Sequence, residues 1–312
     1  MSDFLSAIKD KATAEKILEH LKSTKINVLL IGGTGVGKSS TIDALFRSND
    51  RRVDVRIGDK ASPETMEITQ YEMENLVIWD SPGLGDSTEK DKVHKSKIIN
   101  KLHEKDTNGQ PLIDLVFLIL DASNRDFGSA YTLIKDVVLP NVHDDDRGRL
   151  LVGINQADQA MKGRYWNQKE NRPEPRLADW LDELAKKVKE RIRADTGLEI
   201  EPIYYSAGCI LDGEVLSHPY NLQKLLSFIM DRLPKKKRAA VAMHINENEQ
   251  NFRSNDDKED YTQKVEFSIW ESIKAAVIEV LGAAGKVLKD HATDPDNIKA
   301  AIGFIVKFFV KK

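Results

Sequence analysis

Residues 26–46 read INVLLIGGTGVGKSSTIDALF, and the rest of the chain is best understood outward from this stretch. An apolar run, Ile26–Ile31, ends in a glycine-rich turn, Gly32–Ser39, after which an amphipathic helical pattern begins. The turn has two glycines separated by four residues and followed directly by lysine and serine, which is the spacing of a phosphate-binding loop. The stretch therefore predicts a buried strand, a phosphate-binding loop and a helix, in that order.

Each residue type in this loop has a physical reason to be there. Glycines let the backbone curl until successive N–H groups face a phosphate, and the helix N-terminus adds the positive end of its dipole. Lys38 is expected to bridge the β- and γ-phosphates as a catalytic group, and Ser39 is expected to ligate Mg²⁺. The residues predicted to contact the nucleotide here are Gly33, Thr34, Gly35, Val36, Gly37, Lys38, Ser39 and Ser40.

A second motif, Asp80-Ser81-Pro82-Gly83, follows the apolar run Leu76–Trp79. An aspartate at the carboxyl end of a strand beside a phosphate loop lies where α/β sheets bind their ligands. We expect Asp80 to contact the nucleotide and to hold Mg²⁺ through water. Gly83 has no side chain, so its N–H can approach the γ-phosphate and take part in catalysis. The residues after it, Gly85-Asp86-Ser87, are predicted to form a mobile switch.

A threonine between these two motifs is the candidate for the other switch. Thr65 lies in a polar segment just before the alternating run Glu67–Tyr71. There its hydroxyl can bind Mg²⁺ and its N–H can bind the γ-phosphate, so that the segment is ordered only when the γ-phosphate is present. Thr69 competes for this role, and the place of Thr65 before the strand favours Thr65 as the catalytic and metal-binding residue.

The choice of base rests on two motifs that follow later strands. Asn155-Gln156-Ala157-Asp158 comes after the apolar run Leu150–Ile154, and its final carboxylate can accept the ring N–H and the amino protons of guanine. Adenine has no such donor pair and would leave the buried charge unpaired. Ser206-Ala207-Gly208 follows a later apolar run, and the alanine N–H is expected to meet guanine O6. The residues that complete the predicted GTP site are Asn155, Gln156, Asp158, Ser206, Ala207 and Gly208.

These motifs resemble those of the translation-factor class of P-loop GTPases, especially its Era-like branch with a D-x-P-G switch. IGGTGVGKSSTIDALF together with WDSPGLGDS is most similar to the YfjP/YeeP-type bacterial GTPases. ETMEITQY with WDSPGLGD is also similar to the interferon-inducible, dynamin-like GTPases. The resemblance covers about Ile26 to Leu233. It implies a six-stranded, mostly parallel sheet that binds GTP or GDP at the carboxyl ends of its strands, and hydrolysis of GTP to GDP and phosphate with Mg²⁺.

Four residues depart from the patterns of those families. Leu84 stands where many signalling GTPases have a glutamine that orients the attacking water, which an apolar side chain cannot do. Gly35 stands where the potassium-activated Era-like members have asparagine. Gln156 and Gly208 stand where lysine is common, and at position 156 that lysine normally covers the base and ribose. Slow intrinsic turnover is therefore expected, with the missing group supplied by another residue or by a partner.

Short apolar runs alternating with helical patterns predict an α/β fold with a mainly parallel sheet. The expected strands are Ile26–Ile31, Leu76–Trp79, Leu115–Leu120, Leu150–Ile154 and Pro202–Tyr205, with Glu67–Tyr71 antiparallel to Leu76–Trp79. The expected helices are Ser39–Arg47, Ala130–Val138, Ala178–Arg193 and Leu222–Leu233. Trp166–Arg176 is predicted to be a surface insertion, and Asn246–Lys264 a linker or solvated hairpin. Residues 1–24 then form an N-terminal amphipathic helix, 25–234 the GTPase domain, and 235–312 a linker with a small helical C-terminal region.

The bulk composition is that of a globular protein in a reducing compartment. A net charge of -3 and a pI near 6.2 give no basic field for nucleic acid, which we do not expect as a partner. The single cysteine, Cys209, excludes an internal disulfide framework. The start of the sequence lacks a signal-peptide pattern, and no apolar run is long enough to span a bilayer. The expectation is a cytoplasmic protein that is peripheral at a membrane at most.

One stretch would place the chain at a membrane surface. Within 297–312, Ile298, Ile302, Ile305 and Phe309 form a helical stripe with lysines opposite, as in interfacial helices, although a core helix has the same pattern. Three functions therefore stay open. The chain is a GTP switch read by a protein effector, a dynamin-like GTPase that self-associates through a dimer of GTPase domains at a membrane, or a nucleotide-binding module with negligible hydrolysis.

Overall fold

The computed structural model describes residues 11–46, 68–81, 88–124, 127–142, 148–211 and 214–281. Several predicted features lie outside these residues: Thr65, Gly83, Leu84, the segment Gly85–Ser87, the first turns of the N-terminal helix and the stretch 297–312. What the sequence suggests for them stays a prediction.

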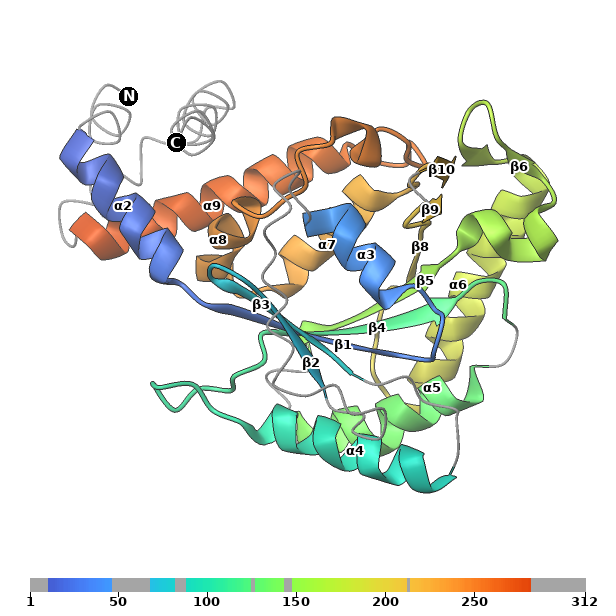
Figure 1. Ribbon diagram of the computed structural model, residues 1–312, viewed down its shortest axis with the longest axis horizontal. Helices are drawn as coiled ribbons and strands as arrows, with labels where there is room; N and C mark the ends of the chain where they lie inside the picture. Colours follow the sequence, from blue (N-terminus) through green and yellow to red (C-terminus); the bar gives the residue numbers. More distant parts are fainter. Residues whose placement is uncertain are drawn as a thin grey trace.

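A six-stranded sheet in the order β2-β3-β1-β4-β5-β8 forms the centre of the molecule (Figure 1). Its parallel strands are β1 (Ile26–Gly32), β3 (Leu76–Asp80), β4 (Leu115–Asp121), β5 (Leu150–Asn155) and β8 (Ile203–Tyr204). The edge strand β2 (Thr69–Met73) pairs antiparallel with β3. The predicted α/β class, the strand set and the antiparallel hairpin are confirmed. The central strands β1, β4 and β5 are almost entirely buried, as expected for apolar runs in a sheet that is covered on both faces.

Helices cover both faces of the sheet and divide the core into two parts (Figure 1). One face carries α2 (Lys11–Ser23), α3 (Lys38–Phe46), α7 (Leu222–Arg232), α8 (Arg238–Ala242) and α9 (Tyr261–Leu281). The other carries α4 (Thr88–His103), α5 (Gly128–Leu133) with the π-helical turn η1 (Ile134–Val138), and α6 (Pro175–Thr196). The predicted helices are present, with ends that differ by a few residues. None of the described helices is long and apolar enough to cross a membrane.

Helix α4 was not expected from the sequence. Its residues, TEKDKVHKSKIINKLH, are mostly charged or polar, and from Asp91 on, where burial is described, only the narrow stripe His94, Ile98 and Leu102 is buried. Such a stripe recurs every fourth residue but is too sparse to stand out against the charges. The helix packs beside η1, and Ile98 and Leu102 join the buried cluster on this face of the sheet, so tertiary contacts stabilise it rather than a strong pattern of its own.

The turn between β2 and β3 holds the N-terminal helix against the sheet. Asn75 Nδ2 donates to the carbonyls of Leu21 and Thr24 at the end of α2, at 2.9 Å in both cases. Asn75 O accepts from the backbone N–H of Ile26 at 2.8 Å. His244 Nε2 lies 2.5 Å from Asn75 Oδ1. One buried asparagine therefore connects α2, the strand hairpin and the segment after α8.

The structure adds two short hairpins that the sequence did not indicate. Trp166–Arg176 contains the short hairpin β6 (Trp166–Asn167) and β7 (Arg172–Pro173), and the Trp166 ring is buried edge-on against Tyr220 at 5.3 Å. The other residues of this insertion are exposed or half-buried, so it lies at the surface as predicted, and the Trp166 ring anchors it to the core. A second hairpin, β9 (Cys209–Leu211) with β10 (Glu214–Ser217), was not predicted.

The polar segment Asn246–Lys264 packs on the sheet domain and is neither a linker nor a hairpin. Asn246 Nδ2 donates to Asp43 O and Asn251 Nδ2 to Ala44 O, both at 2.9 Å, while the Asn246 backbone N–H donates to Leu45 O at 2.8 Å. These acceptors are carbonyls of the last turn of α3, which have no partner within the helix itself. The asparagines are therefore there to cap the helix that follows the phosphate loop.

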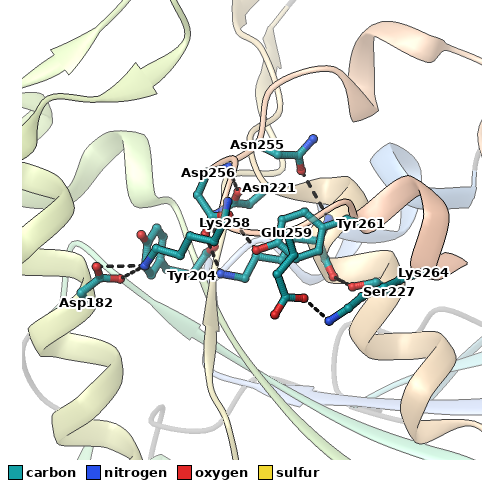
Figure 2. A network of polar contacts seen from close by, with 11 residues as sticks. Asp182, Tyr204, Asn221, Ser227, Asn255, Asp256, Lys258, Glu259, Tyr261 and Lys264 are labelled. Carbon is teal, nitrogen blue, oxygen red and sulfur yellow. Dashed lines mark hydrogen bonds and ion pairs between the residues drawn. The ribbon is translucent and has the colours of Figure 1, made fainter.

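The same segment continues into a polar network between α6, β8, α7 and α9 (Figure 2). Asp256 accepts from Lys224 Nζ at 2.6 Å and from the Tyr261 hydroxyl at 2.7 Å. Asn221 joins the network, because its Oδ1 accepts from the Asp256 backbone N–H and its Nδ2 donates to Tyr204 O. Burial raises the pKa of Asp256, but the bonds from Lys224 and Tyr261 and the Lys224 charge lower it by more. The carboxylate is thus held ionised inside the fold.

Replacing Lys224 with methionine should lower the free energy of unfolding by about 3 kcal/mol, because it leaves a buried carboxylate without its cation. The pair stabilises the fold above the ordinary pKa of an aspartate, and this contribution is lost as the pH falls below it. Urea unfolding at pH 7 and at pH 3 measures both effects. Lys187→Met, which breaks an exposed pair with Glu183, is the control and should cost under about 0.5 kcal/mol. Equal losses in the two variants would contradict the expectation.

Candidate functional site

The phosphate loop joins β1 to α3 as the sequence predicted. Gly35 and Gly37 have φ of 78° and 85°, in the left-handed region that favours glycine. A Cβ on Gly37 would also collide with the side-chain amide of Asn155. The backbone of this loop therefore depends on glycine at position 37 for two reasons, its own conformation and the close approach of the base-side motif.

Lys38 is placed at the start of α3 with its ammonium group turned back over the loop. Its Nζ donates to Gly33 O at 3.1 Å and to Gly32 O at 3.4 Å. Burial lowers the pKa of Lys38, and the nearby Asp80 carboxylate partly opposes this. Anionic phosphate oxygens would supply stronger acceptors than these carbonyls for the same charge.

Asp80 ends β3 beside β1, in register with Leu30, and this brings it to the phosphate end of the site. Burial raises the pKa of its carboxyl to about 6, although Lys38 opposes the shift. Its Oδ1 is buried and has no hydrogen-bond partner among the residues that the structure describes. A buried, unpartnered carboxylate oxygen is a fitting ligand for Mg²⁺ or for a water that Mg²⁺ holds.

Mg²⁺ fits this arrangement of donors. Among the described residues no three His, Cys, Asp or Glu side chains gather, so an all-protein cage is absent there. Mg²⁺ in nucleotide sites is bound by one or two protein oxygens together with phosphates and water. Ser39, in the first turn of α3, and Asp80 are the described side chains that would hold it, and the predicted third oxygen, on Thr65, lies outside the described residues.

Binding of labelled GDP with Mg²⁺ should weaken by about tenfold between pH 7 and pH 5, because Asp80 must release a proton before it can face a cation. The raised pKa means that the group is ionised at pH 7 and mostly protonated at pH 5. Fluorescence titration across this range measures the effect. The phosphates of the nucleotide titrate too, so Asp80→Asn is the control and should show a shallower dependence. Parallel pH curves for the two proteins would contradict the role given to Asp80.

At the other end of the site, Asn155 connects the base-side motifs to the phosphate loop. Its Nδ2 donates to Val36 O at 2.9 Å, and its Oδ1 accepts from the Ala207 N–H at 3.0 Å. Gln156 has φ of 61° and donates from Nε2 to Gly35 O at 2.8 Å. The glutamine in place of the usual lysine therefore braces the loop, a role that the sequence alone did not indicate.

Asp158 and the Ser206–Gly208 loop lie after neighbouring strands, β5 and β8. The Asp158 side chain is buried and accepts from Gln159 Nε2 at 3.0 Å. Ser206 and Tyr220 exchange two backbone hydrogen bonds, which fix the start of the loop. Gly208 has φ of 73°, and a Cβ there would lie 2.8 Å from Ser217 O, which explains why lysine is absent from this position. The Ala207 N–H, predicted to meet guanine O6, is directed to Asn155 in this structure.

The structure thus places the described predicted residues in one region, at the carboxyl ends of β1, β3, β5 and β8. The phosphate side holds the loop from Gly33 to Ser40 with Asp80. The base side holds Asn155, Gln156, Asp158 and the Ser206–Gly208 loop. Two hydrogen bonds join the two sides, one from the Asn155 side chain to Val36 O and one from the Gln156 side chain to Gly35 O. The motifs left out Thr41 and Tyr205, whose hydroxyls lie 2.9 Å apart beneath the site.

Residues 27–152 match the model of a family described as 50S ribosome-binding GTPase. The matched residues belong to a GTPase domain. The match includes the phosphate loop and Asp80 and ends before Asn155, so it covers the phosphate side of the site and leaves the base side to the geometry above. The sequence prediction of a P-loop GTPase is confirmed, whereas the Era-like or YfjP/YeeP-type branch stays a prediction.

Curated relatives are similar over a short region. The chain is 36% identical over 104 residues to Translocase of chloroplast 108, chloroplastic, of Physcomitrium patens, a match that covers 32% of this chain and 10% of the relative. Among solved structures, LeoA, a bacterial dynamin GTPase from ETEC, has 14% identity and a TM-score of 0.40, over 91% of this chain and 43% of LeoA. Toc33 from Arabidopsis thaliana with GDP and Mg²⁺ has 17% identity and a TM-score of 0.39, over 63% and 79%. At such TM-scores neither likeness bears on substrate or partner.

Proposed function

We propose that this chain binds GTP and GDP with Mg²⁺, hydrolyses GTP slowly and acts as a nucleotide-controlled switch. The observation that carries the proposal is the bracing of the Asp158 motif against the phosphate loop. Asn155 and Gln156 donate to the carbonyls of Val36 and Gly35, so the carboxylate that would select the base is held at a fixed place relative to Lys38. A guanine nucleotide has a donor pair at one end and phosphates at the other, which suits this arrangement.

Each described residue has a defined task in the proposed reaction. Lys38 and the backbone N–H groups of the loop bind the β- and γ-phosphates and hold the γ-phosphoryl group in place. Ser39 and Asp80 hold Mg²⁺, which when bound neutralises charge that develops on the phosphate oxygens. Asp158 fixes the base and so keeps the far end of the substrate from moving. Catalysis then consists of positioning and electrostatic stabilisation, with no covalent step on the protein.

Slow turnover is part of the proposal, because the residue after Gly83 is apolar. The Leu84 side chain cannot hydrogen-bond a water molecule, so the attacking water is not oriented from that position. We expect the purified chain to hydrolyse GTP at well under about one per second. A rate at or above that value at low protein concentration would contradict this part of the proposal.

Turnover measured across protein concentration tests the switch function against its alternatives. Phosphate release per molecule that is slow and independent of concentration supports a switch whose effector reads the segments at Thr65 and after Gly83. A rate that rises with concentration favours a self-associating, dynamin-like enzyme, and addition of vesicles shows whether a membrane contributes. GTP binding without measurable release of phosphate favours a binding module.

A further inference from the structure

A fully buried tyrosine lies between the two halves of the candidate site. Tyr205 directly precedes the Ser206–Gly208 loop, and its side chain is inaccessible to solvent. The ring packs beside Phe117 with their centroids 6.4 Å apart. Its hydroxyl group ends 2.9 Å from Thr41 Oγ1 in α3. A side chain from the base side therefore reaches the helix that starts at the phosphate loop.

The directions of these hydrogen bonds are fixed by the number of protons available. Thr41 Oγ1 donates its one proton to Gly37 O, at 2.7 Å. The contact with Tyr205 must then use the Tyr205 proton, so the phenol donates to Thr41. Burial raises the pKa of the Tyr205 phenol, which keeps the group protonated. The result is a chain of two hydrogen bonds from the tyrosine to the carbonyl of the last glycine in the phosphate loop.

The backbone of Tyr205 also joins the two base-side motifs. Its N–H donates to Ile154 O at 2.9 Å, and its carbonyl accepts from the Ala157 N–H at 3.1 Å. Ala157 directly precedes Asp158, whose carboxylate is proposed to select the base. Tyr205 is thus hydrogen-bonded beside that carboxylate and directly precedes the Ser206–Gly208 loop. Asn155 joins the same three parts directly, through Val36 O and the Ala207 N–H, and Tyr205 adds a second connection from the interior of the fold.

A glycine in the neighbouring strand β5 leaves space for the Tyr205 ring. A Cβ on Gly153, in the middle of β5, would lie 2.8 Å from Tyr205 Cε1 and 2.7 Å from Phe117 Cε2. A glycine inside a buried strand weakens the strand, and its presence marks a close approach by a neighbouring group. Here the approaching groups are the two rings. Tyr205 and Phe117 together therefore explain the glycine at position 153.

We propose that Tyr205 and Thr41 are positioning residues that couple recognition of the base to the hold on the phosphates. The proposal rests on the proposed binding of GTP and adds how the two ends of the site act together. The relay keeps the Ser206–Gly208 loop and Gly37 at a fixed separation, so a nucleotide that reaches both ends finds them already aligned. A ligand that contacts the phosphate loop alone gains nothing from that alignment.

The test compares a ligand that spans the site with one that does not. Dissociation constants are measured with Mg²⁺ for GTP and for inorganic tripolyphosphate, on the full chain and on Tyr205→Phe. The variant keeps the ring and removes the donor. GTP binding is expected to weaken by about fivefold to tenfold, the size of one intramolecular hydrogen bond, while tripolyphosphate binding changes by less than about twofold.

Tyr204→Phe is the matched control. Tyr204 is the preceding residue, is also buried, and packs on the opposite face of the sheet, away from α3. It should leave both ligands unaffected. A second pair of variants keeps Tyr205 in place: Thr41→Val breaks the relay and should reproduce the selective loss of GTP binding, whereas Thr41→Ser keeps a hydroxyl and should restore it. Combining Tyr205→Phe with Thr41→Val should cost little more GTP affinity than Thr41→Val alone, because both remove the same relay.

Two results would overturn the coupling. One is an equal loss of GTP and tripolyphosphate binding in Tyr205→Phe, which would mean that the tyrosine acts on the phosphate loop alone. The other is a GTP affinity of Tyr205→Phe equal to that of the control Tyr204→Phe, which would mean that the hydroxyl group of Tyr205 does not contribute. Should Tyr205→Phe fail to fold, as shown by its thermal unfolding, the two Thr41 variants decide in the same way. Absence of GTP binding by the unaltered chain would overturn the proposed function and this proposal together, and it is seen before any variant is measured.

Discussion

Replacement of Asp158 by alanine is expected to weaken GTP binding by about a hundredfold to a thousandfold. The carboxylate is buried after β5, and it is the described group that would accept the two guanine donors together. Its loss removes two charge-assisted hydrogen bonds, each worth about 1.5–3 kcal/mol, and leaves the guanine protons without a partner. Competition of unlabelled GTP against labelled GDP, with Mg²⁺, measures the change.

The same variant should leave the fold intact, which separates loss of recognition from loss of structure. Among the described side chains, the adjacent Gln159 is the one that donates a hydrogen bond to the Asp158 carboxylate. Thermal unfolding without nucleotide should therefore differ little from that of the unaltered chain. Binding of ATP, already weak, should not fall further. A loss of GTP affinity below about fivefold would show that another group selects the base.

Replacement of Lys38 by alanine should lower GTP turnover by about a hundredfold to a thousandfold. The ammonium group is the described cation expected to bridge the β- and γ-phosphates, where negative charge moves during the reaction. Burial already lowers the pKa of Lys38, so its charge is costly to the protein without nucleotide. The variant should consequently be at least as stable as the unaltered chain when no ligand is present.

Single-turnover phosphate release with excess protein measures this effect, and thermal unfolding measures the stability. Lys187→Ala, at an exposed position of α6, is the matched control and should retain full activity. Turnover within about threefold of the unaltered chain in Lys38→Ala would mean that the phosphate loop does not hold the reacting group.

Much of the fold and of the site follows from local patterns. Gly32–Ser39 specifies a strand, a loop and a helix because glycine freedom and the Gly-Lys-Ser order have few other structural uses. Asp80 and Asn155 each end an apolar run, and the carboxyl ends of parallel strands meet at one edge of a sheet. Their position at the same edge of the sheet could therefore be predicted without knowing the strand order.

The parts that could not be predicted depend on contacts between distant residues. The buried stripe of α4 is too sparse among charged residues to predict a helix, and it becomes evident only from its packing in the structure. The asparagines at 246 and 251 suggest a linker by composition, yet they are capping groups for α3, more than 200 positions earlier in the chain. Tyr205 fits a strand run as well as any aromatic residue, and only its contact with Thr41 shows a connection to the phosphate loop.

The central claim is that one pocket holds phosphates with Lys38 and selects guanine with Asp158. Equilibrium titration of the full chain with labelled GTP and labelled ATP, each with Mg²⁺, tests it most directly. The predicted result is binding of GTP at least about a hundredfold tighter than that of ATP. Equal affinity for the two nucleotides, or no binding of either, would contradict it.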